Sequence, residues 1–147
     1  MVLVLTKPLT GNPVTTALCH CLDCRKWTGA AFTSNVVVAR NSFRVIEGTP
    51  KSFEIVAASG KLNTKWVCFI NGVKVGHGTF CLQNPKFCPS CGSSLWSDLE
   101  IEPDLTFIKS GGLDNGAADH NIAAELYVKN RLSYAQPVPG ADQKSEL

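Results

Sequence analysis

Three cysteines within six residues form the part of this sequence best suited to chemistry. Cys19, Cys21 and Cys24 have the spacing C-x-C-x-x-C, so that one loop can direct three sulfurs at a single ion. No fourth ligand follows at knuckle spacing, and Asp23 lies between two cysteines, where geometry makes it a poor ligand. Three protein ligands leave the fourth position of a tetrahedral zinc open, which is typical of catalytic zinc. We therefore predict a reactive zinc site at Cys19, Cys21 and Cys24.

The open position would accept water or the sulfur of a small thiol. Zinc deprotonates a coordinating thiol and so produces a nucleophilic thiolate at neutral pH. His20 could bind the ion, hydrogen-bond to a ligand or move a proton, since its unperturbed pKa is about 6.5, and it could equally face solvent. Arg25 and Lys26 could offset thiolate charge or pair with a substrate carboxylate, or form a solvated face. We predict His20 as a catalytic residue beside the three cysteines, and Arg25 and Lys26 as cofactor-binding residues.

A second cysteine pair, Cys88-Pro89-Ser90-Cys91-Gly92, occurs later in the chain. C-x-x-C lets two thiolates from one tight turn bind the same ion, so Cys88 and Cys91 are predicted to form half of a zinc site. Two alternatives are a buried pair of small apolar side chains and a redox pair, although a redox pair is expected in a βαβ context that this sequence lacks. A third is a zinc ribbon in which Cys21 and Cys24 join Cys88 and Cys91 and leave Cys19 without a role.

The composition favours one folded, soluble domain. The chain has 147 residues, of which 44% are hydrophobic and 18% charged, which argues against disorder and membrane spanning. The net charge is +2 and the basic residues form no block, so nucleic-acid binding is not expected. The apolar start is too short for a secretory signal, so we expect a cytoplasmic location. In that reducing compartment, the seven clustered cysteines favour metal binding over disulfides.

Short apolar runs between turn residues predict a mainly β fold built from hairpins. A single helical turn is expected in residues 25–32, and residues 121–130 suit either a helix or an edge strand. A terminal tail is expected from Gln136 onward. Trp27, Phe32 and Trp96 are expected in the core or a pocket wall. The runs are Val2–Leu5, Val14–Leu18, Asn35–Ala39, Phe43–Ile46, Ser52–Val56, Trp66–Ile70, Val73–Phe80 and Leu105–Ile108, with an Asn71-Gly72 turn between two of them.

Four stretches resemble the glutathione-dependent formaldehyde-activating enzyme family, which includes centromere protein V. The resemblance implies tent-like, small antiparallel sheets organised around cysteine-ligated zinc. It also implies carbon–sulfur lyase activity, in which zinc promotes interconversion of glutathione plus formaldehyde and S-hydroxymethylglutathione. It assigns the reactive zinc to Cys19, Cys21 and Cys24, and part of a structural zinc site to Cys88 and Cys91. The stretches are CHCLDCRKWTGAAF (19–32), FCPSCGSSLWS (87–97), SGGLDNG (110–116) and ELYVKNRLSYAQPVPGADQ (125–143).

The chain departs from the family pattern in two places. The family supplies two further structural ligands from an amino-terminal C-x-C-G, which this sequence does not contain. Residues 66–86 resemble an insertion, and its Cys68, His77 and Cys81 are candidate replacements for the absent ligands. We expect a single zinc domain over residues 1–140 and a tail over residues 141–147.

The predicted function is that of a zinc-dependent carbon–sulfur lyase. Its partners would be a small thiol such as glutathione and a small aldehyde, with neither nucleic acid nor membrane. The alternative is a non-enzymatic, zinc-stabilised binding or scaffold module. That alternative predicts a zinc ion saturated by protein ligands, whereas the lyase requires an open position.

Overall fold

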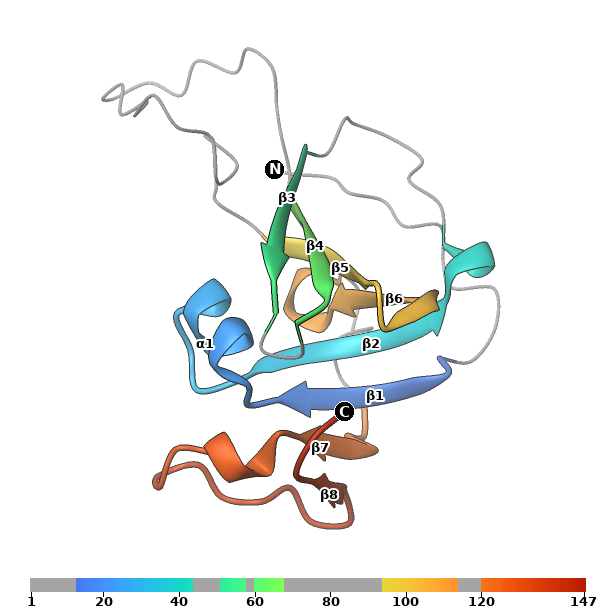
Figure 1. The fold of residues 1–147 in the computed structure, drawn as a ribbon. Helices are drawn as coiled ribbons and strands as arrows, with labels where there is room; N and C mark the ends of the chain where they lie inside the picture. Colours follow the sequence, from blue (N-terminus) through green and yellow to red (C-terminus); the bar gives the residue numbers. More distant parts are fainter. Residues whose placement is uncertain (1–12, 44–50, 58–59, 68–93, 114–119) are drawn as a thin grey trace, which may run out of the picture.

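Among the described residues, eight strands join in one sheet, and one α-helix lies beside the ends of two inner strands (Figure 1). The computed structural model describes residues 13–43, 51–57, 60–67, 94–113 and 120–147. The helix is α1 (Leu22–Thr28), and three 3₁₀ turns are η1 (Arg40–Ser42), η2 (Ser110–Gly112) and η3 (Val128–Asn130). The strands are β1 (Thr15–Cys19), β2 (Thr33–Ala39), β3 (Lys51–Val56), β4 (Leu62–Val67), β5 (Ser94–Leu99), β6 (Glu102–Lys109), β7 (Ala124–Leu126) and β8 (Asp142–Lys144).

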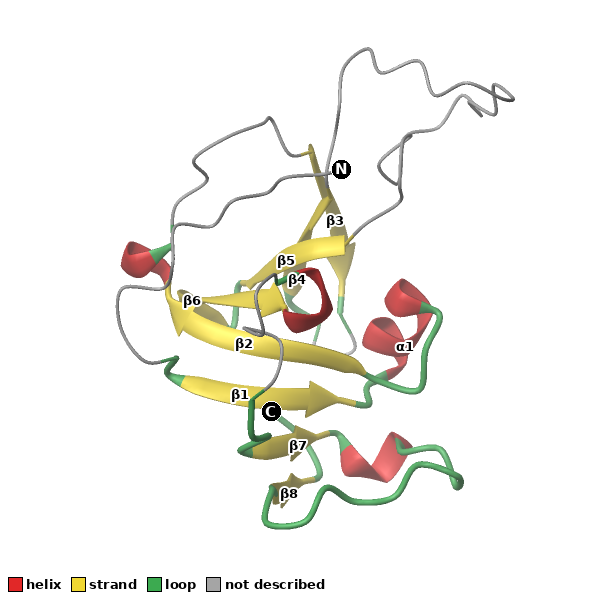
Figure 2. Cartoon of the chain, turned by 180° about the vertical axis from the view of Figure 1, so that it is seen from behind, coloured by secondary structure: helices red, strands yellow, loops and turns green. Residues whose placement is uncertain are grey.

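The strand order is β3-β4-β5-β6-β2-β1-β7-β8, which confirms the mainly β prediction (Figure 2). Neighbouring strands from β3 to β1 run antiparallel. The last two pairings, β1 with β7 and β7 with β8, are parallel. Parallel neighbours cannot be joined by a tight hairpin and need longer connections, which is why the hairpin pattern of the sequence does not predict them.

The two faces of the sheet differ in character because successive side chains of a strand point to opposite faces. Strand register places Ala17 opposite Asn35, Asn35 opposite Lys109, and Lys65 opposite Ser97. We call the face that carries these residues and Cys19 the cysteine face. It contains several buried polar side chains, which an apolar core would exclude.

One of the two buried apolar clusters of the described residues lies around Cys19 and Cys24, and the face opposite the cysteine face carries the other. Val36, Val38, Trp96 and Ile108 pack together there and are each at most 4% exposed. The Phe43 ring lies 4.9 Å from the Trp96 ring. The prediction that Trp96 is a core residue is therefore confirmed.

The helix and the carboxyl-terminal segment differ from the sequence-based expectations. Helix α1 begins at Leu22 and ends at Thr28, because the Cys21 sulfur caps its start and Gly29 ends it with a φ of 66°. Of the two alternatives for residues 121–130, the structure shows the strand, β7, followed by the turn η3, although β7 is not an edge strand because β8 pairs with it. The expectation of a tail from Gln136 onward was wrong for Asp142–Lys144, which pair with β7 as β8.

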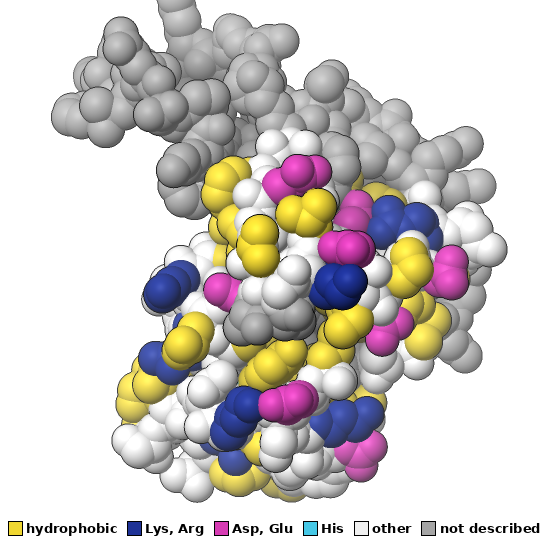
Figure 3. All heavy atoms as spheres, in the orientation of Figure 1, with side chains coloured by type: hydrophobic (Ala, Val, Ile, Leu, Met, Phe, Trp, Pro, Cys, Tyr) yellow, Lys and Arg dark blue, Asp and Glu magenta, His cyan; other side chains and the backbone are white. Residues whose placement is uncertain are grey.

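Most of the described strands correspond to apolar runs predicted from the sequence. Strands β1, β2, β3 and β6 coincide with predicted apolar runs, and β4 overlaps the run that begins at Trp66. The runs Val2–Leu5 and Val73–Phe80 and the Asn71-Gly72 turn lie outside the described residues. On the face shown in Figure 3, basic and acidic side chains of the described residues are interspersed.

Candidate metal centre and its pocket

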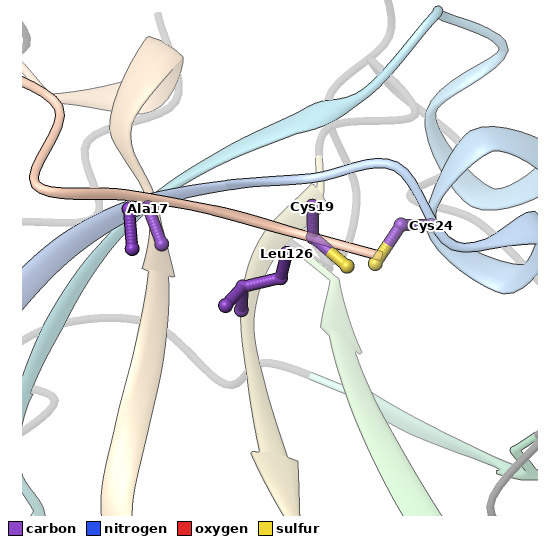
Figure 4. Close-up of a cluster of buried hydrophobic side chains, with 5 residues drawn as sticks. Ala17, Cys19, Cys24 and Leu126 are labelled. Carbon is purple, nitrogen blue, oxygen red and sulfur yellow. The ribbon is translucent and has the colours of Figure 1, made fainter. Parts of the chain in front are cut away.

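The three clustered cysteines converge at the end of β1. Cys19 is the last residue of that strand, Cys21 caps α1, and Cys24 lies in the first turn of α1. Their sulfurs all lie within 4.8 Å of one another, and none of the three is in a disulfide. Figure 4 shows the sulfurs of Cys19 and Cys24 side by side, next to Leu126. The structure therefore brings all three predicted ligands together, including Cys19, which the zinc-ribbon alternative leaves without a role.

Local hydrogen bonds explain why this short loop holds its shape. The Cys21 sulfur accepts from the Cys24 backbone N–H at 3.3 Å, and the Thr28 hydroxyl donates to the Cys24 carbonyl at 2.9 Å. The Gly29 N–H closes the helix by donating to the Arg25 carbonyl at 2.8 Å. Cys24 is the one buried residue of α1. The helix therefore serves to direct that side chain at the end of β1.

The donor set fits a zinc ion. Zinc–sulfur bonds of about 2.3 Å at tetrahedral angles place two bound sulfurs about 3.8 Å apart. Sulfurs that already lie within 4.8 Å of one another reach that spacing through small side-chain adjustments. Soft thiolate donors in this number suit zinc better than the hard cations magnesium or calcium. The Cys19, Cys21 and Cys24 group can therefore hold a metal ion.

Proximity of the three thiols also favours a shared negative charge. Hydrogen bonds from the Cys19 and Cys21 thiols lower the pKa of Cys24 to about 3, against the opposing effect of burial, and the charges of Lys65 and Lys109 lower it further. The pKa of Cys19 is raised, first by its hydrogen bonds to Cys21 and Cys24 and then by burial. The three sulfurs titrate as a unit, with one thiolate stabilised by two neighbouring S–H groups.

A cavity of about 70 Å³ opens beside the sulfurs on the cysteine face. Two of its lining side chains are lysines that are nearly inaccessible to solvent, Lys65 at 1% and Lys109 at 8% exposure. Buried lysines are rare unless they are paired, so their presence next to thiols is informative. The cavity is lined by Cys19, Cys21, Asp23, Cys24, Asn35, Ala57, Lys61, Leu62, Asn63, Lys65, Ser97, Leu99, Ile101, Phe107, Lys109, Leu126, Tyr127 and Leu147.

Lys109 is held in place by a neighbouring strand. Its ammonium group donates to Asn35 Oδ1 at 2.7 Å. Burial lowers the pKa of Lys109 to about 8, and the positive charge of Lys65 adds to this effect, while the sulfurs raise the pKa. Sequence analysis missed both lysines. The available signal was a lysine at an inward position of an alternating strand, which becomes visible only once the strand faces are known.

Tyr127 lies at the edge of the cavity with an unusual backbone conformation. Its φ is 55°, the one positive value at a non-glycine residue among the described residues. Such backbone strain costs of order 1–3 kcal/mol and is found most often at functional sites. Burial raises the pKa of Tyr127, and the nearby sulfurs of Cys21 and Cys19 raise it further. Tyr127 is thus a pocket residue that the sequence analysis did not select.

His20 lies away from the cavity, although it adjoins two of the cysteines in sequence. The side chain is fully buried, and its Nε2 lies 3.0 Å from Glu125 Oε1. Its ring meets Phe32 edge-on, with 5.6 Å between the ring centroids. The backbone N–H of His20 donates to the Leu126 carbonyl at 3.0 Å and extends the pairing of β1 with β7. Because side chains alternate along the chain here, His20 and Cys19 point to opposite faces.

Glu125 has four hydrogen-bond or ion-pair partners among the described residues. Burial alone raises the pKa of its carboxyl, but the hydrogen bonds and the Arg131 charge lower it, and the net shift is downward. Gln143 donates at 2.7 Å, Arg131 at 2.9 Å and the Val138 N–H at 3.0 Å. The carboxylate therefore fastens the carboxyl-terminal segment to β7.

Arg25 and Lys26 lie apart from the cysteine cavity. They line a separate surface hollow together with Leu132 and Tyr134, and the Arg25 guanidinium donates to the Asn130 carbonyl at 3.2 Å. The structure therefore does not bring these two predicted binding residues to the sulfurs. Trp27 stacks on Phe53 with 6.3 Å between ring centroids, and Lys65 lies 6.0 Å from the Trp27 ring. Trp27 is half-buried and is not among the residues that line the cysteine cavity, so the structure does not place it in the core or the pocket wall.

The second predicted zinc site cannot be placed. Cys88 and Cys91 lie outside the described residues, and so do the three candidate replacements in the apparent insertion, Cys68, His77 and Cys81.

The fold and the sulfur cluster define a mainly β protein with a cysteine site suited to a metal ion. A family model described as glutathione-dependent formaldehyde-activating enzyme matches residues 5–80, which include all three clustered cysteines. The chain belongs to that family. No curated protein matches the sequence. In the part of the chain that the structure describes, no helix has the length and apolarity needed to span a membrane.

Proposed function

We propose that this protein is a zinc-dependent carbon–sulfur lyase that forms and cleaves the adduct of glutathione, or another small thiol, with a small aldehyde such as formaldehyde. The observation that carries the proposal is the convergence of three sulfurs within 4.8 Å on the wall of a cavity that also contains two buried lysines. Membership of the family supports the same chemistry.

Cys19, Cys21 and Cys24 would hold the ion. When bound, zinc supplies a Lewis acid that favours the thiolate form of an incoming thiol. Three protein thiolates leave one position for that thiol, provided that no further protein ligand reaches the site. The described residues place no histidine or carboxylate in the cluster with these sulfurs.

The surrounding residues would bind and stabilise the reacting end of the thiol. Lys65 and Lys109 place positive charge near the sulfurs, as their effect on Cys24 shows, and so favour the ionised form of a thiol bound beside them. A cavity of about 70 Å³ holds only a few non-hydrogen atoms. The cysteinyl end of glutathione would therefore enter it, while the remainder of the tripeptide lies outside.

The reaction needs no oxidant or reductant. The thiolate sulfur forms a bond to the carbonyl carbon, and the electron pair of the C=O π bond moves to oxygen. That oxygen takes up one proton, which replaces the proton that the thiol lost. Cleavage is the reverse: the hydroxyl loses its proton, the carbonyl reforms and the thiolate leaves. His20 is assigned a positioning role, because it faces Glu125 and anchors the cysteine loop through its backbone.

Exchange spectroscopy by NMR on glutathione and formaldehyde tests this function. Zinc-loaded protein should accelerate exchange between glutathione and S-hydroxymethylglutathione above the uncatalysed rate. Cys24→Ser should abolish the acceleration. The assay requires that Cys24 and its two neighbouring cysteines in the parent protein remain free of disulfides. A rate equal to the uncatalysed one for the zinc-loaded parent would remove this substrate pair.

X-ray absorption at the zinc edge separates the lyase from the alternative binding module. The lyase predicts three protein sulfurs at the reactive ion and a fourth ligand that changes when glutathione is added. Four protein sulfurs that remain unchanged on addition of glutathione would instead indicate a structural zinc and overturn the proposal.

A further inference from the structure

Beside the sulfurs, the cysteine face carries a group of polar side chains that the sequence analysis did not select. Lys65 and Asn63 come from β4, Ser97 from β5 and Lys109 from β6. All four line the cavity, and each is at most 8% exposed. We call these four residues the polar row. Four buried polar side chains next to one another carry a large desolvation cost unless something binds them.

Two members of the polar row lack hydrogen-bond partners among the described residues. These are the Asn63 Oδ1 and Ser97 Oγ atoms, on neighbouring strands. Ser97 lies directly opposite Lys65 in the strand pairing, so its hydroxyl and the lysine belong to the same stretch of cavity wall. A buried oxygen without a partner costs about 1–3 kcal/mol, and in a native structure it often marks a place where a ligand binds.

The donors and acceptors of the polar row match one oxygen atom that changes between anion and hydroxyl. Two ammonium groups and a serine hydroxyl can donate to an oxygen anion, and the Asn63 carbonyl oxygen can accept from the corresponding hydroxyl. The lysine charges act on the sulfurs as well, but sulfur is a weak hydrogen-bond partner for a hydroxyl or an amide oxygen, so Ser97 and Asn63 complement an oxygen rather than the thiol. The cavity is continuous from the sulfurs to the row, since the same hollow is lined by both.

We propose that the polar row is an oxyanion subsite. Its occupant is the oxygen that becomes negatively charged when a thiolate adds to the carbonyl carbon, and this identification rests on the proposed function. During addition, one negative charge moves from sulfur to oxygen, and the C–S bond forms as the C=O π pair becomes a lone pair. Donors fixed in a buried site stabilise such a charge strongly because they need not reorient. Lys65, Lys109 and Ser97 would then be catalytic residues.

The same groups would also bind a stable anion of similar shape. Formate offers a compact oxygen anion and serves as the probe. Formate binding to the purified full chain, measured by calorimetry, should weaken about tenfold or more in Lys65→Met and in Ser97→Ala, since each removes one donor to a buried anion. Lys129→Met removes an exposed lysine that pairs with Glu146, and it should leave formate binding unchanged.

A steady-state kinetic measurement is the second arm of the test, beside formate binding. Ser97→Ala should lower kcat for glutathione and formaldehyde about 100-fold with little change in KM, since it removes a donor used mainly in the transition state. Ser110→Ala is the matched control, because Ser110 is also buried but donates its hydroxyl to Ser34 at 2.6 Å. It should leave kcat unchanged. The Ser97 change is small enough that the variant should fold even if Lys65→Met does not.

The two arms separate this inference from the proposed function. Formate binding that depends on Lys65 and Ser97, in a protein with no lyase activity, would support the subsite and remove the proposed reaction. Lyase activity that is unchanged in Ser97→Ala and Lys65→Met, together with formate binding that ignores both substitutions, would overturn the subsite and leave the reaction in place.

Discussion

Two buried polar clusters lie on opposite faces of the same sheet, and they differ in how their side-chain oxygens are hydrogen-bonded, although the cluster around Glu125 also holds two buried nitrogens without partners among the described residues, His20 Nδ1 and Arg131 Nε. The Glu125 carboxylate accepts from Gln143, Arg131 and the Val138 N–H, and it contacts His20. The polar row instead contains two buried oxygens without partners among the described residues. A buried carboxylate with this many partners stabilises the fold, whereas a buried oxygen without a partner costs stability that a ligand can recover. The comparison teaches that neither burial nor an unpartnered polar atom identifies a site by itself. The unpartnered oxygens of the polar row are distinguished because they also line the cavity, whereas His20 and Arg131 do not.

The largest expected effect is on the cysteine face. Cys19→Ser should remove the zinc held by Cys19, Cys21 and Cys24 and reduce lyase activity to the uncatalysed rate, because a zinc ion with two remaining thiolates is bound weakly. Zinc content per chain, measured by mass spectrometry of metals, checks this. Cys88→Ser, measured beside it, should leave that ion in place. A loss of all zinc in both variants would indicate one shared ribbon.

On the opposite face, the largest expected effect is on stability. Glu125→Gln should lower the free energy of unfolding by about 3 kcal/mol, because it breaks a buried charge pair and leaves the Arg131 guanidinium without its carboxylate partner. Urea denaturation measures this. The zinc content of the folded variant should be unchanged. A loss below about 0.5 kcal/mol would mean that the hydrogen bonds of the Glu125 carboxylate contribute little, which breaks the comparison.

The same carboxylate predicts a pH dependence. Its pKa is lowered in the folded protein from an ordinary value of 4.5, so its contribution is present above that pH. As the pH falls below 4.5 towards the lower folded pKa, the contribution is lost, since the unfolded chain binds the proton more tightly. The stability of Glu125→Gln should therefore fall less steeply with acid than that of the parent. Parallel curves for the two proteins would contradict this assignment.

A smaller effect is expected at the turn that follows α1. Gly29 has a φ of 66° and no atom within 4 Å of the position that a Cβ would take. Gly29→Ala should therefore cost about 1 kcal/mol through backbone strain alone, without a steric clash. Thermal denaturation gives the stability, and zinc affinity reports whether Cys24 shifts. Gly111→Ala, at a glycine with no strained φ and equal free space, is the control.

The smallest expected effect compares two buried serines. Ser110→Ala should lower stability by about 1 kcal/mol, because it removes a hydroxyl that is hydrogen-bonded to Ser34. Ser97→Ala should leave stability unchanged or raise it slightly, because its hydroxyl has no partner among the described residues. Chemical denaturation of both variants checks the difference. Equal losses would show that Ser97 is as well bonded as Ser110, and the contrast between the clusters would disappear.

The convergence of the three cysteine sulfurs was predictable from the sequence because their geometry is local. Cys19, Cys21 and Cys24 lie in one strand end and one helical turn, so their spacing alone brings the sulfurs together. The mainly β fold was predictable for a similar reason, since alternating apolar runs reflect each strand separately. The start of α1 was missed because a cysteine is an unusual capping residue.

The other residues of the site depend on the order of the strands in the sheet, which no local sequence pattern contains. Lys65 and Lys109 meet the sulfurs only because β4, β5, β6 and β2 lie side by side. His20 meets Glu125 across 105 positions of sequence. Sequence reasoning therefore predicted a catalytic role for His20 from its neighbours in the chain, whereas the strand alternation directs it to the other face. The strand β8 was missed for a similar reason, because its short polar segment becomes a strand only next to β7.

The parallel pairing of β1 with β7 also has a consequence for biosynthesis. Leu126, which covers Cys19, is synthesised more than a hundred residues after it, so the thiols stay uncovered until most of the polypeptide has left the ribosome. Contacts this distant in sequence form slowly. A nascent chain therefore presents three accessible thiols to cellular oxidants and to competing metals, and the order of synthesis makes newly made protein more sensitive to both than the finished fold.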